Sequence, residues 1–369
     1  MQGVPPVQPP TGAGNGASYT HCGRCSKGEI PCRPALTEAL GVWLTARRAA
    51  WVIGRMASAF IFPGQGSQAV GMGADLARSD LAARAVFDEV DDALGEKLSE
   101  VIFAGPLDIL TLTENAQPAL MAVSLAVLRV LETRGIRLAD CAKFVAGHSL
   151  GEYSALAASG ALELRDAARL LRVRGKAMQA AVPVGEGAMA ALLGVGKDVA
   201  EKLAAEASQG DVCQVANDNE PTQAVISGSK SAIDRAAALA KKHGVRRFIP
   251  LNVSAPFHCA LMQPAADAMS EALASVEIRK PLVPVVSNVL ASPIDDPADI
   301  KKRLVEQVTG TVRWRESVLA MVDQGVTDFY ELGAGKVLAG LVKRVAPSVN
   351  ATSIGGPSEI DAAVGLLTK

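Results

Sequence analysis

The sequence predicts an α/β protein with a mainly parallel sheet and a small inserted βαββαβ unit. Two observations support this prediction. From Met56 onward, short apolar strand patterns alternate with segments of helical spacing, which is typical of a parallel sheet covered by helices. Between about residues 185 and 252, two strand patterns follow one another directly, and a strand and a helix flank them on either side. We therefore expect a main domain built from two stretches of chain, residues 56–184 and 253–369, separated by this insertion.

The first stretch of the main domain contains two strand patterns. SAFIF (58–62) predicts a strand that ends at Pro63-Gly64, with a helical run from about Ala69. NAQPALMAVSLAVL (115–128) is too short to cross a bilayer and predicts a buried helix. KFVAG (143–147) predicts a buried strand that leads into the helix GEYSALAASG (151–160). The segment ELRDAARLLRVRGKAMQAA (163–181) has apolar residues at helical spacing, which predicts the next helix.

The insertion has its own order of patterns. GAMAALLGV (187–195) predicts a strand, KDVAEKLAAEA (197–207) a helix, and VCQVAND (212–218) and QAVISG (223–228) two strands. SAIDRAAALAKKHG (231–244) predicts a second helix and RRFIPL (246–251) a last strand. This order is that of a ferredoxin-like unit, which we place at residues 185–252. The main domain resumes with strands in 281–289 and 327–332 and helices in 314–325 and 336–345.

Composition excludes several classes of protein. The chain has 369 residues, 49% of them hydrophobic, and a formal net charge of −1, which suits one large or two smaller globular domains. No basic run of footprint size is present, so we expect no nucleic-acid partner. No segment reaches about 18 uninterrupted apolar residues, so we expect a soluble protein without a membrane span. The single, widely spaced cysteines of the main part favour a reducing compartment.

Residues 1–55 differ from the rest of the sequence. They begin Pro-, Gly- and Ser-rich without hydrophobic period, which indicates disorder, and continue into an apolar, Arg-bearing segment. This extension is either sequence upstream of a true start at Met56, which we favour, or an organellar transit peptide. Its cysteines, Cys22, Cys25 and Cys32, could begin a zinc site, but structural zinc needs four ligands held by a small fold. We therefore expect no metal.

Ser149 is the candidate nucleophile. It lies in Gly147-His148-Ser149-Leu150-Gly151, between the predicted strand KFVAG and the following helix. A Gly-x-Ser-x-Gly motif at a sharp strand-to-helix turn exposes the hydroxyl, as in α/β-hydrolase-like domains. Free N–H groups at the helix N-terminus would favour a developing negative charge. The alternative is a tight turn with an incidental serine.

The nucleophile needs a base, and the main part of the chain has three histidines. His148 adjoins Ser149, and neighbours on a strand point to opposite faces. His243 lies at a predicted helix end, where it complements the helix dipole. His258 lies in a Pro-bearing loop where the chain re-enters the main domain, beside the expected cleft, and is therefore the predicted base; the alternative is a buried loop histidine.

Several motifs occur together in a characteristic order. They are FPGQGSQ (62–68), ENAQPAL (114–120), GHSLGEY (147–153), RVRGKAMQ (172–179), GAMAALLG (187–194), VSAPFHCALM (253–262), EQVTGTVRW (306–314) and ELGAGKVLAGL (331–341). In this combination the sequence resembles the malonyl-CoA:acyl carrier protein transacylase family from about Met56 to the C-terminus. Residues 1–55 have no counterpart in the family core.

The resemblance implies a role for each site residue. Ser149 would attack the thioester of malonyl-CoA, with His258 as general base, and the backbone N–H groups of Gln65 and Leu150 would hold the oxyanion. Arg174 would pair with the malonyl carboxylate, because a guanidinium fork matches a planar carboxylate. The residues alone favour an exposed helix arginine at this position.

Two further implications concern selectivity and the orientation of the base. Phe257, before His258, resembles the malonyl-selective form of the loop. Because no Asp or Glu presents itself as a triad acid, the resemblance assigns the orientation of His258 to backbone carbonyls at Asn288 and Gln307.

The function implied is transfer of malonyl from malonyl-CoA to the phosphopantetheine thiol of acyl carrier protein, for fatty acid biosynthesis. We expect no cofactor, a monomer, and a cytoplasmic location unless residues 1–55 are a transit peptide. The alternatives are a serine thioesterase or hydrolase, a polyketide-type acyltransferase, which normally belongs to a longer chain, and a catalytically silent carrier-binding module.

Overall fold

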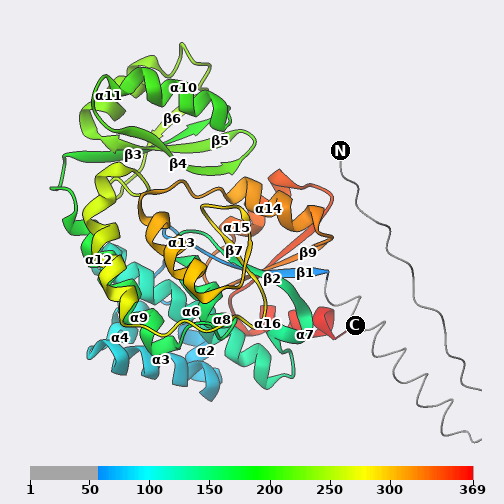
Figure 1. The fold of residues 1–369 in the computed structure, drawn as a ribbon. Coiled ribbons are helices and arrows are strands. Elements are labelled where there is room, and N and C mark those ends of the chain that lie inside the picture. Colours follow the sequence, from blue (N-terminus) through cyan, green and yellow to red (C-terminus); the bar gives the residue numbers. More distant parts are fainter. Residues whose placement is uncertain (1–56, 369) are drawn as a thin grey trace, which may run out of the picture. The chain divides into compact units, whose positions relative to one another are not determined.

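A computed structural model describes residues 57–368, and within them the predicted strands form two separate sheets (Figure 1). The larger sheet has the order β10-β9-β1-β2-β7-β8, and its neighbours are parallel except for the pair β7–β8. Its strands are β1 Ser58–Phe62, β2 Ala142–Gly147, β7 Val285–Ser287, β8 Ser292–Ile294, β9 Asp328–Leu332 and β10 Asn350–Ile354. The prediction of a mixed α/β fold with a mainly parallel sheet is confirmed.

Helices cover both faces of this sheet because its central strands are apolar on both sides. On β1, Phe60 and Phe62 pack into one core with α6 (Thr113–Thr133), α8 (Gly151–Ala158) and α9 (Leu164–Ala180). Ala59 and Ile61 pack into a second core with α14 (Trp314–Asp323) and α15 (Val337–Val345). Successive side chains of a strand point to opposite faces, so one short strand anchors both layers. This arrangement fixes the carboxyl ends of β1 and β2 side by side, with Phe62 opposite Gly147.

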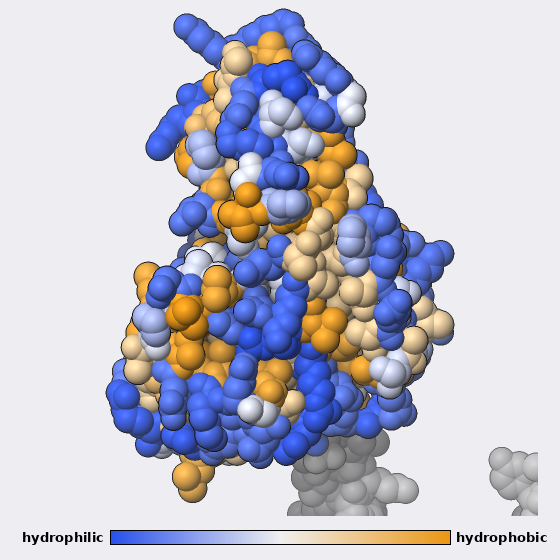
Figure 2. Space-filling model, turned by 90° about the vertical axis from the view of Figure 1, so that its left-hand side faces the viewer, coloured by the Kyte–Doolittle hydropathy of each residue, from blue (hydrophilic) through white to orange (hydrophobic). Residues whose placement is uncertain are grey.

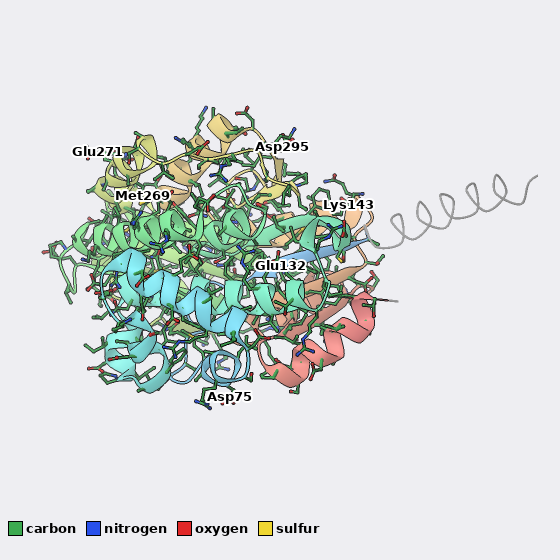
Figure 3. The ribbon with its side chains drawn as sticks, turned by 90° about the horizontal axis from the view of Figure 1, so that it is seen from below. Asp75, Glu132, Lys143, Met269, Glu271 and Asp295 are labelled. Carbon is green, nitrogen blue, oxygen red and sulfur yellow. The ribbon has the colours of Figure 1, made fainter. Side chains whose placement is uncertain are left out.

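The helices of this larger unit are α2 Ala74–Ser79, α3 Leu81–Leu94, α4 Leu98–Ala104, α5 Leu107–Thr111, α6 Thr113–Thr133, α7 Leu138–Cys141, α8 Gly151–Ala158, α9 Leu164–Ala180, α12 Gln263–Ala274, α13 Pro297–Thr309, α14 Trp314–Asp323, α15 Val337–Val345 and α16 Pro357–Leu367, with a 3₁₀ turn at Ala260–Met262. The first helical run begins at Ala74 rather than at about Ala69, because left-handed glycines at Gly71 and Gly73 hold turns before it. Viewed from below, the side chains of Asp75 and Asp295 lie at the periphery of the helical layers (Figure 3).

Helix α6 is longer than the apolar segment predicted from sequence. It has 21 residues, and it is the one helix of the described residues that is long and apolar enough to cross a membrane. However, 83% of its most apolar window is buried inside the structure. On the face shown in Figure 2, hydrophilic residues separate smaller hydrophobic patches. Because most of α6 is buried, we describe it as a core helix, and it packs against α3 and α9.

The second sheet is antiparallel and has the order β4-β5-β3-β6. Its elements follow the predicted βαββαβ order: β3 Gly187–Leu193, α10 Lys197–Ser208, β4 Cys213–Glu220, β5 Gln223–Ser229, α11 Lys230–Leu239 and β6 Arg247–Pro250. Helices α10 and α11 cover one face and enclose a separate core, and Figure 1 shows them on the outer side of the sheet.

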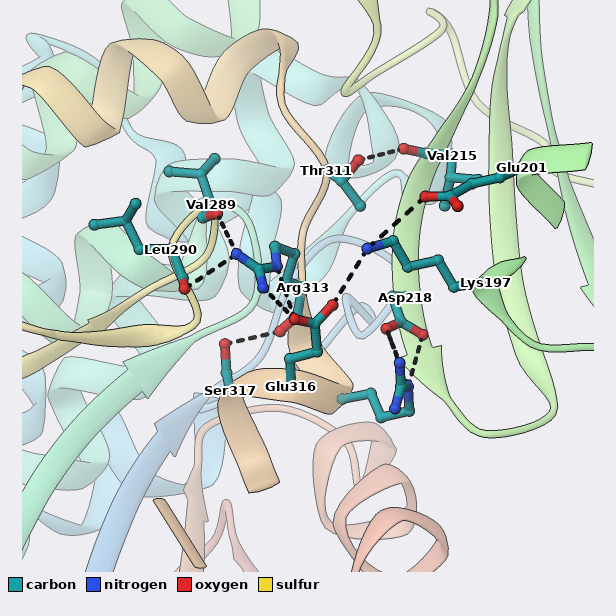
Figure 4. A network of polar contacts seen from close by, with 11 residues as sticks. Lys197, Glu201, Val215, Asp218, Val289, Leu290, Thr311, Arg313, Glu316 and Ser317 are labelled. Carbon is teal, nitrogen blue, oxygen red and sulfur yellow. Dashed lines mark hydrogen bonds and ion pairs between the residues drawn. The ribbon is translucent and has the colours of Figure 1, made fainter. Parts of the chain in front are cut away.

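A polar network joins β4 of this sheet to the start of α14 (Figure 4). The buried Asp218 carboxylate accepts from the Arg315 guanidinium, and Lys197 pairs with Glu316. The backbone N–H of Asp218 also donates to the Val312 carbonyl at 3.0 Å. These contacts fix the second sheet against the chain that follows α13, the helix that carries Gln307.

Strand β10 and helix α16 follow the last predicted helix, and the short strand β8 and helices α12 and α13 were also not predicted. The expectations for residues 1–55 lie outside the described residues.

Candidate active site

Ser149 lies at a sharp turn between β2 and α8. Its φ of 54° is in the left-handed region, which an L-residue adopts only under constraint. A Cβ on Gly147 would lie 1.8 Å from the Gly151 carbonyl carbon, and one on Gly151 would lie 2.3 Å from the Phe62 oxygen. Only glycine allows the strand, the helix and the end of β1 to approach this closely. The turn therefore presents the serine hydroxyl to the cavity at the carboxyl ends of the strands.

His258 contacts the hydroxyl of this serine. Its Nε2 lies 2.8 Å from Ser149 Oγ, and its Nδ1 lies 2.9 Å from the backbone carbonyl of Gln307. Since a carbonyl only accepts, Nδ1 carries the proton and Nε2 is left as the acceptor for the serine proton. Burial, followed by the positive charge of Arg174, lowers the pKa of His258 to about 3. The imidazole is therefore neutral at physiological pH and can act as a general base.

The two carbonyls expected to orient His258 behave differently. The Gln307 carbonyl occupies the expected position, but the prediction for Asn288 is wrong. The Asn288 carbonyl accepts from the Arg313 N–H at 3.0 Å, because the chain turns from β7 toward α14 there. The Asn288 side chain instead binds the nucleophile turn: Oδ1 accepts from the Ser149 N–H at 2.7 Å, and Nδ2 donates to the Gly147 carbonyl at 2.6 Å.

Arg174 is buried, with 1% of its surface exposed, although the sequence alone favours an exposed helix arginine. Its Nη1 donates to Gln117 Oε1 at 2.8 Å, and its Nη2 donates to Gln307 Oε1 at 2.9 Å and to Ser149 Oγ at 3.2 Å. The Tyr153 ring lies 5.7 Å from the guanidinium carbon. Within residues 57–368 no carboxylate bonds to this guanidinium, and its Nε has no partner. The buried cation therefore faces Ser149 with donor capacity left for an anion.

A cavity of about 270 Å³ opens over these groups. Its walls include Gln65, Gln117, Ser149, Leu150, Arg174, Met178, Met189, Phe257 and His258. Among the described residues, no acceptor is found for the backbone N–H of Gln65 or of Leu150. The structure thus brings every predicted site residue except the Asn288 carbonyl to the Ser149 region.

The other histidines have different partners. His148 Nε2 lies 2.9 Å from Asn219 Oδ1, and burial lowers its pKa. His243 Nε2 lies 2.8 Å from Glu206 Oε2, and neither residue lines the cavity. Neither histidine bonds to Ser149. Within residues 57–368, no group of three or more His, Cys, Asp or Glu side chains gathers as a metal site.

Sequence reasoning missed two residues of this site, Gln117 and Glu152. Gln117 lies on α6 and accepts from Arg174. Glu152 lies on α8, buried behind Ser149, and bonds to Asn288 and Gln307. Both lie within motifs quoted above. The local signal for Glu152 is that it is the one acid in the helix GEYSALAASG. The other residues of this helix are mostly small and apolar, so the helix has no polar face that would lie in solvent.

Comparison with known proteins finds close relatives of this chain. The family model described as acyl transferase domain matches residues 59–355. The malonyl CoA-acyl carrier protein transacylase of Bacillus subtilis is 48% identical over 313 residues, which are 84% of this chain and 96% of the relative. The structure of the acyl-carrier-protein-S-malonyltransferase from Bartonella henselae is 54% identical and superposes with a TM-score of 0.83, covering 85% of this chain and 100% of that one.

A further solved structure is a complex. It is described as a type II PKS acyl-carrier protein in complex with its malonyl-transacylase, and it matches with 40% identity and a TM-score of 0.81, covering 84% of this chain and 99% of that one. The family model and these relatives span nearly all of the described residues. The chain belongs to the malonyl-CoA:acyl carrier protein transacylase family.

Proposed function

We propose that the protein transfers the malonyl group of malonyl-CoA to the phosphopantetheine thiol of acyl carrier protein, for fatty acid biosynthesis, through a malonyl-serine intermediate. One observation carries the proposal. Ser149 Oγ lies 2.8 Å from a neutral imidazole and 3.2 Å from a buried guanidinium inside one cavity. A nucleophile, a base and a cation suited to a carboxylated acyl group are thus at one point.

In the first half-reaction His258 Nε2 takes the Ser149 proton while Oγ attacks the thioester carbonyl. The N–H groups of Gln65 and Leu150 stabilise the negative charge on the carbonyl oxygen. The C–S bond then breaks, coenzyme A leaves as the thiol with the proton from His258, and malonyl remains on Ser149. In the second half-reaction His258 takes the proton of the carrier thiol, whose sulfur attacks the ester carbonyl. The bond between the acyl carbon and Ser149 Oγ breaks, and His258 returns the proton to Oγ.

Arg174 supplies the selectivity for a carboxylated acyl group. A malonyl carboxylate beside the guanidinium satisfies a buried cation that otherwise has only amide and hydroxyl partners. An acetyl group offers this guanidinium no carboxylate to bond to. We propose that no cofactor takes part and that malonyl-CoA acts as the donor substrate.

The domain organisation supports this assignment. We propose that residues 185–252 are a ferredoxin-like subdomain inserted into an α/β-hydrolase-like domain of residues 56–184 and 253–369. The antiparallel sheet has its own core, and its β3 residue Met189 and the loop residue Leu251 line the cavity. The insertion would form one wall of the acyl site in a cytoplasmic, monomeric enzyme.

A hydrolase would use the same nucleophile with water as acceptor. Its His258 would be oriented by a carboxylate, whereas within residues 57–368 the partner of Nδ1 is the Gln307 carbonyl. A polyketide-type acyltransferase shares the chemistry and differs in its carrier.

The test incubates the full chain and malonyl-CoA with phosphopantetheinylated carrier, with the apo carrier, or with buffer alone. Mass spectrometry then measures malonyl-carrier, and a thiol reagent measures coenzyme A. We expect malonyl-carrier to form only with the thiol-bearing carrier. Equal release of coenzyme A and free malonate in all three samples would identify a hydrolase instead.

A further inference from the structure

Glu152 is a buried acid that the mechanism above does not use. It lies in the first turn of α8, three residues after Ser149, with 1% of its surface exposed. Its Oε2 accepts from the Asn288 backbone N–H at 3.1 Å and from Gln307 Nε2 at 2.8 Å. One carboxylate oxygen thus contacts the turn after β7, through Asn288, and helix α13, through Gln307.

We propose that Glu152, in its ionised form, is a positioning residue for malonyl transfer, because its carboxylate fixes the orientation of Gln307 and Asn288 and through them Ser149, His258 and Arg174. This inference rests on the function proposed above, since the reaction it supports is acylation of Ser149 by malonyl-CoA.

The first step of the argument concerns the side-chain amide of Gln307. Its Nε2 donates to Glu152 and, at 2.9 Å, to the Ser149 carbonyl, while its Oε1 accepts from Arg174 Nη2 at 2.9 Å. An amide can flip, but an ionised carboxylate only accepts hydrogen bonds. A flipped amide would place Oε1 against two acceptors and its NH₂ against a guanidinium. The carboxylate, together with the Ser149 carbonyl, therefore favours the amide orientation that holds Arg174 beside Ser149.

The same residue carries the contact to the base. The Gln307 backbone carbonyl accepts from His258 Nδ1, so the position of the Gln307 side chain and the orientation of the imidazole depend on one residue of α13. In a typical triad a carboxylate contacts the histidine directly. Here the Glu152 carboxylate does not contact His258. It contacts Gln307, and the Gln307 backbone carbonyl contacts the histidine.

The second branch runs through Asn288. Glu152 accepts from its backbone N–H, and the Asn288 side chain then bonds to the Ser149 N–H and to the Gly147 carbonyl. These two bonds hold the backbone on both sides of the left-handed Ser149. The strained turn is thereby fixed by a residue whose own backbone is fixed by Glu152.

One cation acts on Glu152 from the elements packed against α8. Among the groups on elements packed against α8, the Arg174 guanidinium of α9 is the cation that acts on Glu152, and the Tyr153 phenol lies beside both. Strands β1 and β7 carry no titratable side chain, and Lys143 of β2 donates to the Gln324 carbonyl. The other charged side chains of α6 and α9 face ion-pair or hydrogen-bond partners of their own: Glu114, Arg129, Glu132, Arg165, Asp166, Arg169, Arg172 and Lys176.

Burial raises the pKa of Glu152 to about 7, although the bonds from Asn288 and Gln307 and the charge of Arg174 act in the opposite direction. The carboxyl therefore loses its proton as the pH rises through about 7, and only above that pH does it act solely as an acceptor. Because the pKa of His258 is lowered to about 3, the base does not titrate in this range. The acylation rate should consequently follow the ionisation of Glu152.

The experiment measures the burst of coenzyme A released when the full chain is mixed with malonyl-CoA, from pH 5.5 to 8, without carrier because its thiol titrates itself. The wild-type rate should fall about tenfold per pH unit below pH 7. In Glu152→Gln, whose amide is neutral at every pH, the rate at pH 8 should be about 10- to 100-fold lower and should no longer depend on pH, since small misplacements of reacting groups cost rate on this scale.

The matched control is Glu331→Gln. Glu331 is also fully buried and also accepts backbone N–H groups, those of Leu338 and Ala339, but it contacts none of the catalytic groups. This variant should keep the pH dependence and most of the rate, so that a general effect of neutralising a buried acid is separated from the role of Glu152.

A Glu152→Gln variant that keeps the wild-type rate and the same dependence on pH would overturn the proposal. If this variant does not fold, the wild-type profile decides: a rate that is flat from pH 5.5 to 8 contradicts the proposal, and a fall centred near pH 7 supports it. A wild-type chain that releases no coenzyme A but folds would instead overturn the proposed function, and the inference with it.

Discussion

Replacing Arg174 by alanine should remove the preference for malonyl over acetyl donors. The guanidinium is buried, carries three hydrogen bonds to neutral groups and faces Ser149. In the malonyl complex proposed above it would gain a carboxylate, which an acetyl group lacks. The substitution therefore removes an interaction that only the carboxylated substrate makes, together with contacts that both substrates share.

The magnitude follows from the burial of the pair. Leaving one member of a buried, hydrogen-bonded ion pair alone costs about 3–5 kcal/mol, and each 1.4 kcal/mol is about a factor of ten. The interaction between Arg174 and the malonyl carboxylate is thus expected to raise kcat/KM for malonyl-CoA by about 10²- to 10⁴-fold. Loss of the bonds to Gln117 and Gln307 loosens the support of His258 for either donor, so this part cancels in the ratio of the two kcat/KM values.

The assay determines kcat/KM with malonyl-CoA and with acetyl-CoA for the wild type, Arg174→Ala and Arg172→Ala. Arg172 lies on the same helix but contacts Asn115 and Glu96 outside the cavity, so its removal should leave the ratio unchanged. In Arg174→Ala the ratio of malonyl to acetyl should fall at least about 100-fold. If both donors lose activity equally, Arg174 supports the site without recognising the carboxylate, and the reasoning is refuted.

Three further predictions concern the turn, the titration and the extension. Gly147→Ala should cost at least about 3 kcal/mol of unfolding free energy in urea, because its Cβ would overlap the Gly151 backbone at 1.8 Å; an unchanged midpoint would contradict this. The raised pKa of Glu152 means that its contribution to stability is complete below about pH 4.5 and is lost as the pH rises through about 7. Urea titrations at pH 5 and 8 should therefore show Glu152→Gln gaining up to about 3 kcal/mol on the wild type at the higher pH, and no gain would place this pKa near its ordinary value. A chain without residues 1–55 should retain the malonyl transfer rate, and a large loss would show that the extension contributes.

The strand-to-helix turn at Ser149 could be predicted because its determinants are local. Gly147 and Gly151 flank the serine, an apolar strand precedes it and a helix follows, so one short continuous stretch of sequence contains the information. The alternating β/α order and the βαββαβ insertion were predictable for the same reason: each element has its own hydrophobic period. The strand predicted in 281–289 is confirmed by β7, whereas β8, with three residues, is too short for a period to show.

The environment of Arg174 could not be derived in this way. Its burial depends on α6, whose Gln117 accepts from it, and on α13, whose Gln307 lies 133 positions away in the chain. No local pattern on α9 separates this arginine from Arg172, which contacts Glu96 nearer the surface. The resemblance to a family supplied the assignment, and the packing of three helices supplies its physical reason.

The error at Asn288 has a similar origin. A side chain and its backbone carbonyl lie on the same residue, and the sequence does not show which of the two faces the site. The turn after β7 directs the carbonyl to Arg313 and the amide to Ser149. Glu152 was missed because a helical acid is ordinarily solvated, and only the packing of β2, β7 and α9 around α8 encloses it.

The most direct test of the account is the chemical identity of the acylated residue. The full chain is incubated with radiolabelled malonyl-CoA, digested, and the labelled peptide is sequenced by mass spectrometry; a second sample then receives phosphopantetheinylated carrier. The account predicts label on Ser149, none on Ser149→Ala, and transfer of the label to the carrier thiol. Label on another residue, or undiminished labelling of Ser149→Ala, would contradict it.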